Sequence, residues 1–181
     1  NFIDGVNGVA SGLGAFTLFI FSILIGENVL YGLKEFLVLM SCITLAFSII
    51  NLFSGKIFLG DAGAYFLGCL IGWSGVLIAT KNPNVSPWAI FLIIIYPATE
   101  ITVSVFRRIF RKTSPIIADN LHLHSLLYQF LSKNININSK LINSITGVII
   151  LVVGILPGIY CIKINGLFPN TLKACIFFFL V

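Results

Sequence analysis

Two long apolar runs are joined by Lys56-Ile57-Phe58-Leu59-Gly60-Asp61-Ala62-Gly63, the stretch that is most informative about the fold and its chemistry. Asp61 is the only aspartate between Asp4 and Asp119. A carboxylate at the edge of a membrane span is costly to place, and glycine lets a ligand approach the backbone closely. The stretch therefore indicates a phosphate or metal site, although Asp61 as the N-cap of the next helix is a plainer alternative.

The composition excludes an ordinary water-soluble domain. Of the 181 residues, 58% are hydrophobic and 9% are charged, and the mean hydropathy is +1.06. Soluble domains carry about 25% charged residues. We therefore predict an all-α fold, a polytopic transmembrane helix bundle. The net charge of +5 gives no sign of nucleic-acid binding, and the four cysteines lie in apolar runs without metal-ligand spacing.

The apolar runs predict about five complete spans plus a partial sixth, since a helix needs about 20 residues to cross the hydrocarbon layer. We treat residues 1–181 as a single membrane domain. Because it begins at Asn1 inside a motif and its last apolar run covers about half a crossing, we expect a fragment of a longer protein. The predicted runs are 9–25, 36–53, 62–79, 87–106 and 141–162, with the partial run from 171.

The polar segments 1–8, 54–61 and 107–140 are separated from one another by two crossings, so they are expected on one face of the membrane. They hold seven lysines and arginines, whereas the loops of the other face hold three. By the positive-inside rule the first face is cytoplasmic. The segments that carry chemistry are therefore expected to meet substrates in the cytoplasm.

Asn1-Phe2-Ile3-Asp4-Gly5-Val6-Asn7-Gly8 places polar side chains among glycines just before the first apolar run. Backbone amides at a helix start favour anions. Asp4 and Asn7 would share a face on a helical turn. An Asx turn that caps the helix is the structural alternative.

The segment 107–140 opens with Arg107-Arg108 and contains the chain's two histidines, His122 and His124. On an extended segment the two imidazoles would point the same way. They could bind a metal or a phosphate, or act as acid or base. The basic cluster could equally be a membrane anchor. Glu100, inside an apolar run, is a functional candidate or a structural ion-pair partner of Arg107 or Arg108.

Together these motifs resemble the bacterial polyprenyl-phosphate N-acetylhexosamine-1-phosphate transferases, in the branch that initiates O-antigen, enterobacterial common antigen and teichoic acid synthesis. The resemblance runs from Asn1 to about Leu127. It comprises the Asn-x-x-Asp-Gly-x-Asp-Gly motif at 1–8, the Phe-x-Gly-Asp-x-Gly-Ser motif at 58–64, and a last loop with Pro97, Glu100, Arg107-Arg108 and Ser114-Pro115-x-x-x-Asp119-x-x-His122-x-His124.

The resemblance implies a Mg²⁺-dependent transferase, with Mn²⁺ as an alternative metal. A polyprenyl phosphate (undecaprenyl phosphate) would attack a UDP-sugar, release UMP and start a cell-surface polysaccharide such as lipopolysaccharide. It implies an enzyme of the bacterial inner membrane whose site faces the cytoplasm, and leaves a homodimer open. The implied catalytic residues are Asp61, His122 and His124, with Asp61 as metal ligand; those implied for substrate binding are Asn1, Asp4, Asn7, Asn51, Lys56, Gly60, Glu100, Arg107, Arg108 and Asp119.

The chain departs from the family pattern at three positions. Asn7 stands where many members have Asp, Ala64 replaces a common Ser, and Ser125 replaces a third His. The family's paired upstream aspartates are absent, so we predict that the 181 residues alone are inactive. A transporter with a cytoplasmic phosphate or metal site is the alternative function, and a membrane scaffold without chemistry is a third.

Overall fold

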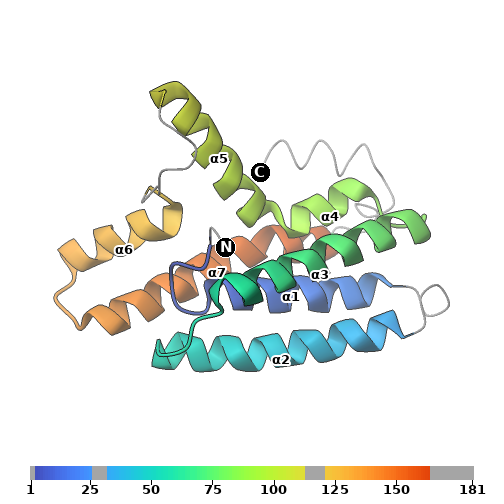
Figure 1. The fold of residues 1–181 in the computed structure, drawn as a ribbon, viewed down its shortest axis with the longest axis horizontal. Coiled ribbons are helices and arrows are strands. Elements are labelled where there is room, and N and C mark those ends of the chain that lie inside the picture. The colour runs from blue at the N-terminus through green and yellow to red at the C-terminus, as the bar shows by residue number, and fades with distance from the viewer. Residues whose placement is uncertain (1–2, 26–31, 113–120, 164–181) are drawn as a thin grey trace.

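The computed structural model describes residues 3–25, 32–112 and 121–163, and these residues form helices and no strand (Figure 1). The prediction of an all-α bundle is confirmed. The helices are α1 (Val9–Leu24), α2 (Leu33–Ser54), α3 (Gly60–Lys81), α4 (Pro87–Ile93), α5 (Ile95–Arg111), α6 (Leu123–Asn134) and α7 (Ser139–Lys163).

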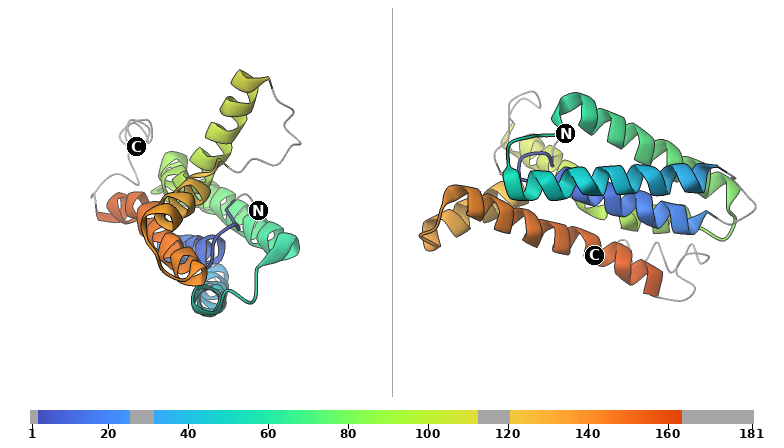
Figure 2. Two further views of the ribbon diagram at one scale, coloured as in Figure 1. Left: turned by 90° about the vertical axis from the view of Figure 1, so that its left-hand side faces the viewer. Right: turned by 90° about the horizontal axis from the view of Figure 1, so that it is seen from below.

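Helix α1 lies at the centre of the bundle and contacts α2, α3 and α7 (Figure 2). Leu18 and Phe21 of α1 are fully buried in a core shared with α2, α3 and α4. Gly12 and Gly14 let the neighbours approach, because a Cβ at either position would meet a leucine side chain at once. Small residues serve close packing between membrane helices in this way.

Within the described residues three helices, α2, α3 and α7, are long and apolar enough to cross a membrane, and α4 with α5 makes a fourth crossing if the bent pair counts as one span. Helix α1 is apolar but shorter. Large apolar side chains such as Phe53 and Trp73 are exposed on the outer surface, where lipid solvates them in a membrane protein. The chain is thus a multi-pass membrane protein. The partial run from 171 lies outside the described residues.

The run 87–106, predicted as a single span, is broken. Helices α4 and α5 meet at Ile94 and are bent by 80° relative to each other. Pro97 explains the position of the break: it has no N–H for the carbonyl of Ile93, the residue four positions earlier, and its ring clashes with that carbonyl in a continuous helix. Helix α5 consequently leaves the bundle at a steep angle (Figure 1).

The loops 3–8 and 55–59 and helix α6 gather at one end of the bundle (Figure 1). At the opposite end, the Asn82 side-chain amide donates to the Leu24 carbonyl oxygen at 2.7 Å and joins the ends of α3 and α1. Helix α6 was predicted only as part of a polar loop. Its apolar residues recur with helical spacing at 123, 126, 127, 130 and 131, which is the signal that identifies it.

Candidate functional site

The loops 3–8 and 55–60 are docked onto each other. The Gly60 backbone N–H donates to the Asp4 carboxylate. The Asn7 side chain lies against Gly55, so that a Cβ on Gly55 would come within 2.8 Å of Asn7 Nδ2. Asp4 and Asn7 therefore both face the second motif, although residues 3–8 form turns rather than the helical turn considered from their spacing.

Asp4 and Asp61 form the acidic part of the site. Burial raises the pKa of the half-buried Asp4 carboxyl, and the negative charge of Asp61 raises it further, while the Gly60 amide opposes both effects. Two carboxylates that repel each other in this way offer a place for a cation, because the positive charge relieves the repulsion. Among the described residues no three His, Cys, Asp or Glu side chains come together as a metal site.

Asp61 does not serve as the N-cap of α3. The helix starts at Gly60, its N-cap is Leu59, and Asp61 lies in the first turn without a recorded capping bond within the described part of the chain. Gly60 has a φ of 66°, a left-handed conformation that glycine adopts at no steric cost. The exposed Asp61 side chain is therefore left available for a ligand.

The Asn51 side-chain amide joins the loops 3–8 and 55–60. It is 4% exposed, its side-chain oxygen accepts from the Gly8 N–H, and its NH₂ group donates to the Ile57 carbonyl oxygen. The Ser48 hydroxyl adds a bond of 3.0 Å to the Gly8 carbonyl oxygen. A substrate-binding role for Asn51 stays a prediction, and in the structure its amide serves the loops.

Helix α7 contacts the first motif through Asn143 and Gly147, which were not predicted from the sequence as site residues. The Asn143 side-chain oxygen accepts from the Asn7 N–H at 2.9 Å. Gly147 passes so close to the Asn7 carbonyl that a Cβ there would overlap it. Asn143 could have been found as a polar residue inside an apolar run; Gly147 carried no local signal.

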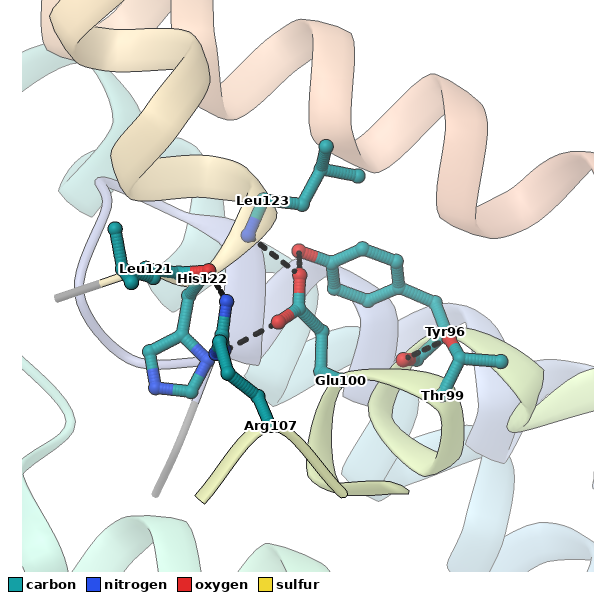
Figure 3. A network of polar contacts seen from close by, with 7 residues as sticks. All are labelled: Tyr96, Thr99, Glu100, Arg107, Leu121, His122 and Leu123. Atoms are coloured by element: carbon teal, nitrogen blue, oxygen red, sulfur yellow. Dashed lines mark hydrogen bonds and ion pairs between the residues drawn. The ribbon is translucent and has the colours of Figure 1, made fainter. Parts of the chain in front are cut away.

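Glu100 and His122 meet between α5 and the start of α6 (Figure 3), and His124 stacks on His122 to complete a second cluster. His122 Nδ1 lies 3.1 Å from Glu100 Oε2. The two imidazole rings stack, with centroids 5.4 Å apart and planes 5° apart. The segment is not the extended one considered from the sequence, because His122 is the N-cap of α6 and His124 lies in its first turn. In the described part of the chain Glu100 lies against His122 and Tyr96, and the expected ion pair with Arg107 or Arg108 stays a prediction.

His124 joins the two clusters. A Cβ on Gly5 would lie 2.7 Å from His124 Nε2, so the ring rests directly on the backbone of the first motif. His124 is 3% exposed, and burial lowers the pKa of its imidazole, with Glu100 opposing the shift and His122 adding to it. The structure thus brings the first, second and third motifs into one site.

The remaining predicted residues lie at the rim or outside the described chain. Arg107 donates to the Leu121 carbonyl oxygen at 2.5 Å and links α5 to the start of α6. Arg108 is half-buried on α5 and Lys56 is exposed on the loop before α3. Asn1 and Asp119 lie outside the described residues.

An apolar cavity of about 200 Å³ opens beside the acidic pair. Its lining includes Ile3 and Leu59, the neighbours of Asp4 and Gly60 in sequence. From there it runs between α1 and α3 to the break between α4 and α5, where Pro97 lines it. The site is therefore polar at the loops and apolar toward the membrane.

Comparison with known proteins matches this arrangement to a family. Residues 1–79, which carry the first two motifs, match glycosyl transferase family 4. This part of the chain is therefore similar to glycosyl transferase family 4. The resemblance drawn from the motifs is confirmed by this match and by relatives that cover about 70% of the chain. No solved structure matches the chain.

Several similar proteins are named as decaprenyl- or undecaprenyl-phosphate N-acetylglucosamine-phosphate transferases. A decaprenyl-phosphate N-acetylglucosaminephosphotransferase of Mycolicibacterium smegmatis is 28% identical over 71% of this chain and 37% of its own length. A probable undecaprenyl-phosphate N-acetylglucosaminyl 1-phosphate transferase of Bacillus subtilis is 34% identical over 72% and 37%. A phospho-N-acetylmuramoyl-pentapeptide-transferase of Prochlorococcus marinus is 31% identical over 70% and 34%. The chain thus spans little more than a third of the length of these relatives.

Proposed function

We propose that the complete protein transfers an N-acetylhexosamine-1-phosphate from a UDP-sugar to undecaprenyl phosphate and releases UMP, at the cytoplasmic face of the bacterial inner membrane. The observation that carries the proposal is the meeting of the three motifs: the Gly60 amide on Asp4, and the His124 ring on Gly5. Acidic groups, imidazoles and arginines around one loop cluster suit a reaction between two phosphate-bearing substrates.

The acidic pair fits Mg²⁺. This ion binds in proteins through one or two carboxylates and completes its shell with water and substrate phosphates. Asp61, with Asp4 beside it, would hold the ion, which when bound would neutralise and orient the diphosphate of the donor. Mn²⁺ favours similar oxygen ligands.

Different parts of the site would bind the two substrates. His122 and His124 would contact phosphate oxygens, and Arg107 and Arg108 would add positive charge at the same face. The apolar cavity that opens between Ile3 and Leu59 would take the first part of a prenyl chain, which keeps the lipid phosphate next to the acidic pair. Excluding water there would favour attack by the lipid phosphate over hydrolysis.

The test is Asp61→Asn in the complete protein, measured as Mg²⁺-dependent UMP release from UDP-GlcNAc with undecaprenyl phosphate as acceptor. We expect activity to fall about 100-fold or more, the effect of losing a group that stabilises charge in the transition state. Glu35→Gln is the matched control, because it removes the same charge from the first turn of α2, outside the motif cluster. Undiminished activity in Asp61→Asn refutes the metal role. A wild-type protein inert with every UDP-sugar favours the transporter instead.

A further inference from the structure

The first two turns of α7 are hydrogen-bonded to both segments that carry the acidic pair. The Asn143 side-chain oxygen accepts from the Asn7 backbone N–H at 2.9 Å. The adjacent Ser144 hydroxyl donates to the Leu52 carbonyl oxygen at 2.6 Å. Asn7 lies in the first motif, and Leu52 lies in the last turn of α2, shortly before the second motif. Two neighbouring residues of one helix thus bond to segments far apart in the chain.

Both bonds serve backbone groups that lack a partner in their own secondary structure. The last four carbonyls of a helix have no intrahelical donor, and that of Leu52 is among them because α2 ends at Ser54. Asn7 is 5% exposed and lies in a turn, and its N–H is directed at α7. A buried backbone group is costly to leave unpaired, so these bonds hold the two segments firmly to α7.

The position of Asn7 affects how the first motif meets the second. The Asn7 side chain lies against Gly55, at the start of the second loop. Asp4, three residues before Asn7 in the same run of turns, accepts from the Gly60 N–H and lies within range of the charge of Asp61. A displacement of Asn7 would therefore change the position of Asp4 relative to Asp61.

Asn143 holds the first motif from a side that α2 does not reach. Helix α2 bonds to Gly8, through the Asn51 side-chain oxygen and the Ser48 hydroxyl. Asn143 bonds to the preceding residue, Asn7, from α7. Attachment to two helices fixes the end of the loop where attachment to α2 alone would let it turn. Groups outside the metal shell commonly orient metal ligands through such bonds.

We infer that Asn143 is a positioning residue for the acidic pair, whose side-chain oxygen holds the Asn7 backbone so that Asp4 stays beside Asp61 to bind a divalent cation. Ser144 acts in the same way on the end of α2. Both residues lie outside residues 1–79, the part that matches the family. The inference rests on the proposed function for the cation, and on the geometry alone for the attachment of the loop to α7.

Two substitutions at residue 143 test the bond itself. Asn143→Leu keeps the approximate size of the side chain but removes the acceptor, whereas Asn143→Asp retains an oxygen that can accept from Asn7. Asn143→Ala removes the acceptor without adding a branched side chain and serves if Asn143→Leu does not fold. Asn134→Leu is the matched control, because Asn134 is exposed on α6 and its amide donates to the Phe130 carbonyl oxygen of its own helix.

The first measurement is hydrogen exchange of the first motif in the complete, metal-free protein, followed by mass spectrometry of a peptide that contains Asn7. We expect exchange about 2- to 10-fold faster in Asn143→Leu, as the loss of one hydrogen bond implies. Asn143→Asp and Asn134→Leu should exchange at the wild-type rate. An unchanged rate in Asn143→Leu overturns the inference, because the bond then does not hold the loop.

The second measurement is Mn²⁺ binding to the complete protein without substrates, followed by the electron paramagnetic resonance signal of the free ion and made well below Tm. We expect the Kd to be about 10- to 100-fold higher in Asn143→Leu. Asn143→Asp and Asn134→Leu should bind at least as tightly as the wild type. A residue with a merely structural role would lower Tm and leave the Kd of the folded protein unchanged.

The outcomes separate the inference from the proposed function. An unchanged Kd in Asn143→Leu, in a wild type that binds Mn²⁺, overturns the positioning role and leaves the proposed function standing. Equal weakening in Asn143→Asp and Asn143→Leu overturns it as well, because the acceptor is then irrelevant. A wild type that binds no Mn²⁺ refutes the metal role and the inference together. A raised Kd in Asn143→Leu, in a protein inert with UDP-sugars, upholds the inference and refutes sugar-phosphate transfer alone.

Discussion

Gly5→Ala should disturb the site through one contact that the structure identifies. Gly5 does not need a left-handed backbone, so alanine can adopt its conformation, but the added Cβ would lie 2.7 Å from His124 Nε2. Ordinary van der Waals contact begins at 3.4 Å, so the ring or the loop must move by about 0.7 Å. The ring has little freedom, because His124 is 3% exposed and stacks on His122.

The expected cost follows from overpacking a buried contact, about 1–3 kcal/mol in the free energy of unfolding. The assay is thermal unfolding of the complete protein in detergent, for Gly5→Ala, His124→Ala and the double variant. Once His124 is truncated, the new methyl group has room, so Gly5→Ala should cost almost nothing in that background. The difference between the two backgrounds, about 1–3 kcal/mol, is the coupling energy of the pair.

Gly72→Ala is the matched control, because nothing in the described chain lies within 4 Å of a Cβ at that position. It should be neutral or slightly stabilising, as alanine is the better helix former. If the effects of Gly5→Ala and His124→Ala are simply additive, the contact between the first and third motifs is not formed in the folded protein, and the site as described is wrong.

Three further outcomes are expected. Asn51→Ala leaves the buried Gly8 N–H without its partner, so it should lower the free energy of unfolding by about 1–3 kcal/mol, measured by thermal unfolding. Unchanged stability would contradict the role of Asn51 in joining the loops. Gly147→Ala on α7 should cost about 1–3 kcal/mol or more by pushing on the Asn7 carbonyl, and a Tm equal to that of the wild type contradicts the close packing. Because the pKa of His124 is lowered in the folded protein, the unfolded chain, in which the histidine has a pKa of about 6.5, takes up its proton at a higher pH. The stability that the neutral, buried His124 ring contributes is therefore complete above that pH and is lost as the pH falls below it. The loss between pH 8 and pH 5 should be smaller in His124→Gln, and an equal loss in both proteins contradicts burial of a neutral ring.

Much of the fold was predictable because membrane insertion depends on local composition. Each apolar run of sufficient length must satisfy its own backbone, so runs such as 36–53 and 62–79 could only be helices. Helix α6 was missed because the polar residues of 107–140 concealed a short amphipathic pattern. The bend at Ile94 was missed because proline is tolerated in membrane helices, and sequence alone does not say whether neighbours accommodate it.

The candidate residues were equally readable as motifs, since a lone Asp61 or a His pair at a span end is conspicuous against an apolar background. Most of the hydrogen-bond partners of these residues could not be predicted from the sequence. Tyr96 reaches Glu100 through the i, i+4 spacing of α5, but Leu123 lies 23 residues away, and a backbone N–H donor has no signature in sequence. The role of the Asn51 amide in joining the loops was likewise not predictable, because its partners, the Gly8 N–H and the Ile57 carbonyl, are backbone groups.

The sequence by itself determined that this protein is a bundle of membrane helices with charged and glycine-rich motifs at the span ends, since hydrophobic length and residue type are local properties. Tertiary structure alone decided that the Gly60 amide meets Asp4 and that His124 rests on Gly5. Those contacts join segments far apart in the chain, and they form because packing around α1 brings the ends of α2, α3 and α7 together. The lone Asp61 between two apolar runs thereby acquires Asp4 as a neighbouring carboxylate, and Gly5, next to Asp4 in sequence, contacts His124.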